Sequence, residues 1–224
     1  PTDRRAVGAW GGGAVLTNPG PGRLIVIEGL DGAGTTTQVR LLHARLSRER
    51  AVYVTHEPSE GPVGLLIRAA LEHRVRVDDA TLAALFAADR MDHLYHTVGE
   101  GGIAAHLGRG EDVLTDRYHL SSLAYQGMTL DWNWIWDMHA HCIRPDLTLF
   151  LDVPVAVCLE RIASGRGAHF ELFENREALT RARESYLASI ERLRRLGETI
   201  AVVDGDALPD EVHARIWAHV EPLL

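Results

Sequence analysis

The stretch VIEGLDGAGTTTQ, from Val26 to Gln38, constrains the fold of this chain more than any other feature of its sequence. A continuously apolar run begins at residue 23 and ends within this stretch. Such a run is typical of a strand buried on both faces. Glycines then interrupt the run, and a helical spacing of apolar residues follows from residue 35. A buried strand that turns directly into a helix predicts a parallel sheet covered by helices.

The alternation of apolar runs and amphipathic stretches continues along the chain. Strands are expected at residues 23–29, 51–57, 112–118, 147–153 and 199–205. Helices are expected at residues 35–49, 62–73, 79–97, 101–108, 119–126, 131–142, 154–163, 175–195 and 208–222. We therefore predict an α/β fold, with a five-stranded parallel sheet flanked by helices on both faces. Residues 23–224 are expected to form a single domain, and the Gly- and Pro-rich residues 1–22 a flexible tail.

Composition limits the partners of the chain. Hydrophobic residues make up 46% of its 224 residues, enough for a large core, and the net charge of −8 argues against a nucleic-acid coat protein. All 23 basic residues are arginine, because the sequence contains no lysine. Cys142 and Cys158 do not make a disulfide framework, and we find neither a transmembrane run nor a signal-peptide pattern. A reduced, cytoplasmic setting is expected, with no membrane or nucleic-acid partner.

The glycine-rich turn nearly matches the phosphate-loop pattern G-x-x-x-x-G-K-[ST], with Thr35 at the position of the lysine. Such glycines let successive backbone N–H groups wrap around an anion at a helix N-terminus. The hydroxyl of Thr36 stands where these loops bind Mg²⁺. A glycine-rich turn without a ligand is the alternative interpretation. The residues expected to contact a nucleotide here are Gly29, Gly32, Ala33, Gly34, Thr35, Thr36 and Thr37.

Four further motifs follow in a fixed order. They are HEPSEGPVG, LAALFAADRMDHL, DRYHLSSLAYQG and RPDLTLFLDVPVAVCLERI. With them, the chain from about Arg23 to Val220 resembles thymidylate kinases, which phosphorylate dTMP with ATP. The third motif is the most specific, since it is similar to the family's D-R-Y-x-x-S-S-x-A-Y-Q-G. The resemblance implies a P-loop nucleoside monophosphate kinase fold, ATP and Mg²⁺ as cofactors, dTMP as acceptor, and a homodimer.

The resemblance also implies roles for the acceptor-binding residues. Phe86 would stack on the thymine ring, Arg90 would donate to a base carbonyl, and Tyr125 would lie against the deoxyribose. A core phenylalanine and a surface ion pair are the alternative interpretations of Phe86 and Arg90. Ser122 would bond the base edge. The remaining residues expected around dTMP are His56, Glu57, Pro58, Ser121 and Gln126.

The residues expected near the reacting phosphates follow the first three strands. Asp31 would bind the sugar 3′-hydroxyl, and Asp116 would hold Mg²⁺ through water beside Thr36. Arg117 would clamp the acceptor phosphate or the transferring group. Glu57 would contact a Mg²⁺-bound water. A buried cluster of ion pairs is an alternative, compatible interpretation of Glu57, Asp116 and Arg117.

Two departures from the family pattern remove cations from the phosphates. Thr35 replaces the loop lysine, and His56 replaces the arginine of R-E-P, although a histidine is partly neutral at pH 7. The lid expected at about residues 164–175 is also poor in basic residues. We expect Arg117, Arg161 and Arg166 to substitute for them, with Arg161 contacting the nucleotide. The expected catalytic residues are Asp31, Asp116, Arg117 and Arg166.

Several interpretations stay open at this point. The chain can be a dTMP kinase, a kinase for a related 5-modified pyrimidine deoxynucleotide, or a catalytically weak pseudokinase that binds nucleotides. The sequence HAHC also suggests a zinc site, because His139 and Cys142 share a helix face, but no fourth ligand stands nearby. Trp132 and Trp136 are expected in the core or in a subunit interface.

Overall fold

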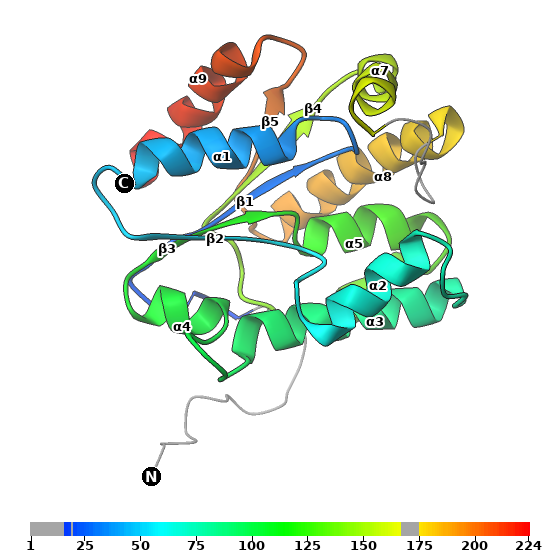
Figure 1. Cartoon of the computed structure of the whole chain (residues 1–224), viewed down its shortest axis with the longest axis horizontal. Helices are drawn as coiled ribbons and strands as arrows, with labels where there is room; N and C mark the ends of the chain where they lie inside the picture. Colours follow the sequence, from blue (N-terminus) through cyan, green and yellow to red (C-terminus); the bar gives the residue numbers. More distant parts are fainter. Residues whose placement is uncertain (1–15, 19, 167–174) are drawn as a thin grey trace.

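The computed structural model describes residues 16–18, 20–166 and 175–224. Five parallel strands form one sheet in the order β2-β3-β1-β4-β5 (Figure 1). The strands are β1 (Leu24–Gly29), β2 (Val52–His56), β3 (Asp112–Asp116), β4 (Leu147–Asp152) and β5 (Ile200–Asp204). Each lies within the range expected from its apolar run, so the predicted sheet is confirmed.

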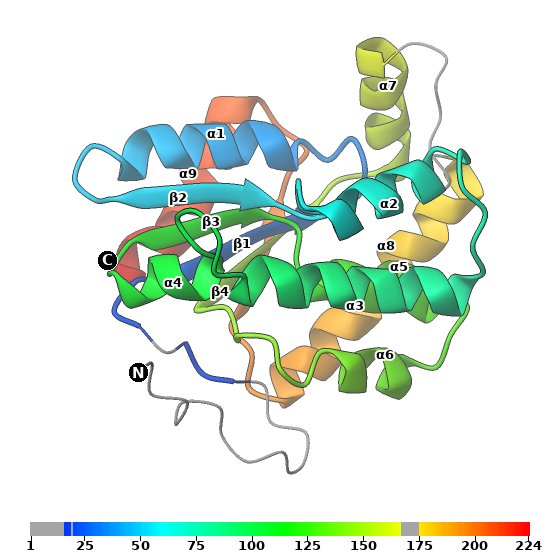
Figure 2. The same cartoon turned by 60° about the horizontal axis from the view of Figure 1, so that its bottom comes forward.

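Helices cover both faces of this sheet. Helices α1 and α9 lie on one face, and α4, α5 and α8 lie on the other (Figure 1 and Figure 2). The helices are α1 (Thr35–Leu46), α2 (Pro62–Leu71), α3 (Asp79–Tyr95), α4 (Ile103–Gly108), α5 (His119–Tyr125), α6 (Trp132–Met138), α7 (Val155–Arg166), α8 (Arg176–Arg195) and α9 (Pro209–Val220), with short 3-10 turns at Gln126–Met128 and Glu221–Leu223. Within the described ranges, no helix combines the length and apolarity that crossing a membrane requires.

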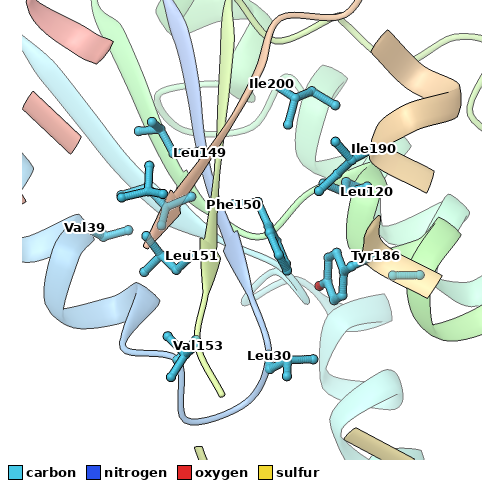
Figure 3. Close-up of a cluster of buried hydrophobic side chains, with 14 of the residues drawn as sticks. Leu30, Val39, Leu120, Leu149, Phe150, Leu151, Val153, Tyr186, Ile190 and Ile200 are labelled. Carbon is cyan, nitrogen blue, oxygen red and sulfur yellow. The ribbon is translucent and has the colours of Figure 1, made fainter. Parts of the chain in front are cut away.

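The inner strand β4, which lies between β1 and β5, shows how the core is divided between the two faces. Successive side chains of a strand point to opposite faces, so Phe150 and its neighbour Leu149 enter different layers. Phe150 packs against Tyr186 of α8, with ring centroids 4.9 Å apart, whereas Leu151 lies on the side of Val39 in α1 (Figure 3). All five side chains are at most 5% exposed. The sheet is therefore held from both sides, which fixes the edge where its strands end.

The carboxyl ends of three strands meet at one edge of the sheet. In the register, Asp116 at the end of β3 stands opposite Ile27 of β1 and His56 of β2. Gly29, which ends β1, begins the glycine-rich loop that leads into α1. Parallel strands place their final residues together, so residues far apart in the sequence gather at this edge.

The described residues among the first 22, which are 16–18 and 20–22, are bound to the domain, so the flexible tail expected over residues 1–22 does not extend to them. Leu16 pairs with Ile143 in a parallel bridge, and Asn18 Nδ2 donates to the carbonyl of Gly22 at 2.6 Å. A Cβ at Gly22 would come within 2.1 Å of the Glu111 carbonyl oxygen. Here glycine allows close packing against the domain, a role that composition alone does not distinguish from flexibility.

We expect Phe150→Ala to lower the free energy of unfolding by about 3–5 kcal/mol, because it leaves a cavity between the sheet and α8. Val202 is the matched control, since it stands opposite Phe150 in the β4–β5 register but is 38% exposed. Val202→Ala should cost less than about 1 kcal/mol. Urea denaturation measures both values, and equal losses in the two variants would contradict the assignment of Phe150 to the core.

Candidate active site

Two adjoining hollows open at the carboxyl edge of the sheet. The first, here called the loop cleft, has a volume of about 720 Å³ and includes most of the glycine-rich loop, His56, Asp116 and Arg161. The second, here called the inner pocket, is smaller, at about 170 Å³. The inner pocket is lined by Asp31, Glu57, Pro58, Leu71, Phe86, Arg90, Arg117, Tyr118, Ser121, Ser122, Tyr125 and Gln126. Nearly all the sequence-predicted site residues described in the structure line one hollow or the other.

The glycine-rich loop has the backbone conformation that an anion-binding loop needs. Gly32 and Gly34 have φ values of 80° and 95°, a region that other residues rarely adopt. A Cβ at Gly32 would also approach the Cys158 carbonyl oxygen to 2.4 Å, so only glycine fits against α7. The loop leads into the N-terminus of α1 at Thr35, where the helix dipole favours a negative charge.

Thr36 and Asp116 form a pair of oxygen ligands at the edge of the loop cleft. Thr36 Oγ1 donates to Asp116 Oδ2 at 2.7 Å. The second oxygen, Asp116 Oδ1, is buried and has no hydrogen-bond partner in the described part of the chain. A hydroxyl and a carboxylate are the hard oxygen ligands that Mg²⁺ prefers. The pair therefore fits a hydrated Mg²⁺, which the sequence analysis placed at these two residues.

Arg161 on α7 reaches over the glycine-rich loop. Its Nη1 donates to the Ala33 carbonyl at 3.2 Å, and the same nitrogen is 3.9 Å from the position of a Cβ on Gly34. Arg161 forms no salt bridge with any described carboxylate. Its guanidinium therefore lies beside a loop that lacks its lysine, without a carboxylate partner among the described residues.

Asp31 and Arg117 form an ion pair at the junction of the two hollows. Arg117 Nη2 donates to Asp31 Oδ1 at 2.6 Å, and Tyr125 donates its hydroxyl to Asp31 Oδ2 at 3.3 Å. Burial opposes the charge of Arg117, but Asp31 and nearby groups hold its pKa well above the ordinary value. Arg117 also has a φ of 72°, which a non-glycine residue rarely adopts. The fold thus holds a charged arginine in a strained conformation at the site.

Glu28, which no sequence motif identified, is a buried carboxylate that binds the residues around this junction. This buried carboxylate accepts from the backbone N–H groups of Tyr118 and Ser121, the Ser121 hydroxyl at 2.6 Å and the Tyr186 hydroxyl at 3.1 Å. Burial raises the pKa of Glu28, although the nearby charge of Arg117 lowers it. A lone glutamate in an apolar strand was the available signal. Its position next to the loop glycine now connects β1 with α5 and α8.

Glu57 holds Arg90 inside the inner pocket. Arg90 Nε and Nη2 lie 2.8 and 2.6 Å from Glu57 Oε2, and both side chains are at most 3% exposed. His93 Nδ1 lies 3.4 Å from the other carboxylate oxygen and links the pair to Thr55 through Nε2. Burial raises the pKa of Glu57, but Arg90 and His93 outweigh this effect and lower it below its usual range. Glu57 thus belongs to the buried ion pair that was the alternative interpretation of this residue.

The remaining walls of the inner pocket combine aromatic and polar side chains. Phe86 is half-buried and faces the pocket, whereas Ser122 accepts from Arg90 Nη1 at 3.1 Å. Burial, as the largest cause, raises the pKa of Tyr125 far above its ordinary value, so its hydroxyl stays protonated. Leu71 on α2 and the buried Tyr118 also line the pocket, and the sequence analysis did not identify them. Leu71 lies outside the quoted motifs, whereas Tyr118 is the tyrosine of D-R-Y, to which the resemblance gave no role.

His56 lies beside an arginine that the sequence analysis did not consider. Arg68 on α2 donates from Nη2 to Glu60 Oε1 at 2.6 Å, and the same nitrogen is 3.2 Å from His56 Nε2. Arg68 Nη1 donates to the backbone carbonyls of Pro58 and Ser59, so it holds the loop after β2. The structure thus places a guanidinium beside the position from which the family's arginine is missing.

Some predicted features lie outside the described residues. Residues 167–174 hold most of the expected lid, and the structure describes nothing of the Arg166 side chain.

For the HAHC sequence, Cys142 Sγ lies 3.9 Å from His139 Nδ1. In the described ranges, no three metal-ligating side chains gather into a site. Trp132 and Trp136 stack at 5.8 Å and pack against the core.

Comparison with known proteins identifies the family. A family model for thymidylate kinase matches residues 27–216, which include the glycine-rich loop and both hollows. The chain belongs to the thymidylate kinase family. This finding makes it a member of the nucleoside monophosphate kinases and agrees with the motifs read from the sequence.

Relatives match almost over their whole length. A Treponema pallidum protein, provisionally described as a thymidylate kinase, is 38% identical over 198 residues, covering 88% of this chain and 93% of the relative. Similarly described proteins of Thermococcus onnurineus and Aeropyrum pernix are 36% and 37% identical, covering 88% and 82% of this chain and 96% and 86% of their own.

We expect His139 to make this thymidylate kinase family member less stable in acid. Burial, with Arg90 and His119 as further causes, lowers the pKa of His139 well below 6.5. The unfolded chain therefore binds a proton as the pH falls through about 6.5 while the folded chain does not, so this contribution to stability is lost as the pH falls, by at most about 1.4 kcal/mol per pH unit.

Urea denaturation between pH 7.5 and 5 measures this effect. Because His139→Gln removes the titrating group, we expect its stability to depend less on pH than that of the wild-type protein. His219→Gln, on the exposed surface of α9, serves as the control. Parallel curves for wild type and His139→Gln would contradict the prediction.

Proposed function

We propose that this protein transfers the γ-phosphoryl group of ATP to dTMP, giving ADP and dTDP. One observation carries the proposal: Asp31, Glu57 and Arg117 line both the loop cleft and the inner pocket. A phosphate group bound by the loop and an acceptor held in the inner pocket would meet at these residues. Membership of the thymidylate kinase family supports the same reaction.

The inner pocket suits a pyrimidine deoxynucleotide. We place the base against the Phe86 ring, with its polar edge toward Arg90 and Ser122, because flat rings stack and an arginine donates to carbonyl oxygens. Tyr125 would then lie beside the sugar, and Asp31 would accept from its 3′-hydroxyl. Gln126, Ser121 and Pro58 would complete the wall around the nucleotide.

The loop cleft suits the triphosphate of ATP. Backbone N–H groups of the loop and the N-terminus of α1 would hold phosphate oxygens. Thr36 and Asp116 would hold a hydrated Mg²⁺, which neutralises phosphate charge when it is bound. Arg117 would leave Asp31 to bind the transferring or acceptor phosphate, since charge stabilisation is the main contribution of such sites.

The two alternatives are less well supported. A kinase for a 5-modified pyrimidine deoxynucleotide would use the same pocket, but no described side chain marks a space for a larger 5-substituent. A pseudokinase has no need of the arrangement of Thr36, Asp116 and Arg117 at one edge. The family relatives favour dTMP as the acceptor.

A homodimer and a cytoplasmic location also stay proposals. Leu65 and Leu66 on α2 are 55% and 40% exposed, and they offer an apolar surface on the helix that the resemblance assigns to a dimer. Both cysteines are free and buried, which is compatible with a reducing compartment. Light scattering of the purified protein tests the dimer, and a monomer at micromolar concentration would contradict it.

The deciding experiment is an assay of ADP release with ATP and Mg²⁺, run with dTMP, dUMP, dCMP and no acceptor. We expect turnover that depends on the acceptor and is fastest with dTMP. Binding of dTMP measured by calorimetry is the companion measurement. Tight binding without turnover by folded protein would reject the kinase and support the pseudokinase.

We expect Arg161→Met to lower kcat/KM for ATP by about 10²-fold, because it removes a cation beside the loop that lacks its lysine. Adding Thr35→Lys to this variant should restore part of the loss, since the new cation would reach the same phosphates. Arg48→Met removes an equal charge from the exposed turn after α1 and should change little. Full activity of Arg161→Met, or no recovery in the double variant, would show that Arg161 does not replace the lysine.

A further inference from the structure

His139 contacts Arg90, the arginine that we place toward the base, and the proposed function gives this histidine no role. It follows α6 directly and is 1% exposed. Arg90 Nη1 lies 3.2 Å from both Nδ1 and Nε2 of its ring. In the sequence, this histidine stands out only as a member of HAHC. In the structure it faces an arginine, and no metal-ligating trio forms around it among the described residues.

The contacts of Arg90 leave little of its guanidinium free to turn. Nε and Nη2 engage Glu57 on one side, while Nη1 faces Ser122 and His139 on the other. A guanidinium carries five N–H groups, so one hydrogen on Nη2 has no partner in the described part of the chain. Arg90 lines the inner pocket, where that donor can meet a base carbonyl. The direction of this N–H group depends on the residues that bind the other four N–H groups of Arg90.

His139 can accept from Arg90 only as a neutral ring. A neutral imidazole carries one unprotonated nitrogen, and this is the only ring nitrogen that can accept from Nη1. Burial and the charge of Arg90 lower the pKa of His139, which keeps the ring neutral near pH 7. The Cys142 thiol, 3.9 Å from Nδ1, is the second polar contact of the ring.

The titratable groups around His139 come from several elements. Arg90 faces it from α3 and Cys142 from the segment after α6. His119 at the start of α5 acts on it electrostatically, and is itself paired with Glu198 before β5 at 3.0 Å. Among these groups the carboxylate of Glu198 contacts His119. Arg90 and His139 face each other directly.

We propose that His139 is a positioning residue for pyrimidine recognition, which holds the Arg90 guanidinium in the orientation that donates to a carbonyl on the base. This inference rests on the proposed function. A thymine or uracil ring presents a carbonyl oxygen where cytosine presents an amino group. Because arginine has donors only, a fixed Arg90 favours the carbonyl and opposes the amino group. Loss of the His139 acceptor frees Nη1 and weakens this discrimination.

The test compares His139→Leu, which removes the acceptor, with His139→Gln, which keeps one. For His139→Leu we expect KM for dTMP to rise and the ratio of kcat/KM for dTMP to that for dCMP to fall about tenfold, equivalent to about 1.4 kcal/mol. His139→Gln should keep the ratio within about threefold of wild type. A purely structural role would lower activity toward both nucleotides equally and leave the ratio unchanged.

Circular dichroism confirms folding of each variant, and His219→Leu on exposed α9 is the control. If His139→Leu does not fold, His139→Met replaces it, because a thioether fills similar space and accepts only weakly. An unchanged dTMP-to-dCMP ratio in the acceptor-free variant, or an equal loss in His139→Gln, would overturn the role of His139. Absence of turnover in the wild-type protein would instead reject the proposed function.

Discussion

The buried ion pair between Glu57 and Arg90 connects the parts of the molecule on which the inner pocket depends. Glu57 directly follows β2, and Arg90 lies on α3, which also carries Phe86. Removing either partner leaves an uncompensated buried charge, so the ion pair ties α3 to the residue after β2. His93 on one side and His139 on the other extend this pair into a network across the pocket floor. Its satisfied contacts turn a flexible arginine into a fixed donor.

The loop cleft adjoins the inner pocket, and its positive charge comes from arginines because the chain has no lysine. Arg117 is already charged, strained and paired with Asp31, while Arg161 lies beside the loop backbone. Arg68 stands 3.2 Å from His56, where the family pattern has its own arginine. Arginine brings planar, bidentate donors rather than a point charge, so the cations at this edge of the sheet differ in shape from a lysine ammonium.

Much of the fold and part of the site could be predicted from the sequence. The apolar runs located all five strands, both the buried β1, β3 and β4 and the more exposed edge strands β2 and β5. The resemblance of the motifs to those of thymidylate kinases named Asp31, Phe86 and Arg117. The motifs missed Glu28, whose bonds reach Ser121 and Tyr186, and Arg68, which lies on α2 beyond the quoted motifs and contacts His56 and Glu60. Glu57, expected at a magnesium-bound water, forms with Arg90 the buried ion pair that was its compatible alternative.

By itself, the sequence determined the α/β architecture, the glycine-rich loop and the absence of lysine from the whole chain, since periodicity, loop glycines and composition are local or additive properties. Only the tertiary structure decided which arginine lies near which carboxylate, and that the first described residues pack on the domain. It also turned His139 from a possible zinc ligand into a neighbour of Arg90. Side-chain partners depend on distances across the folded chain, and no spacing along the sequence encodes those distances directly.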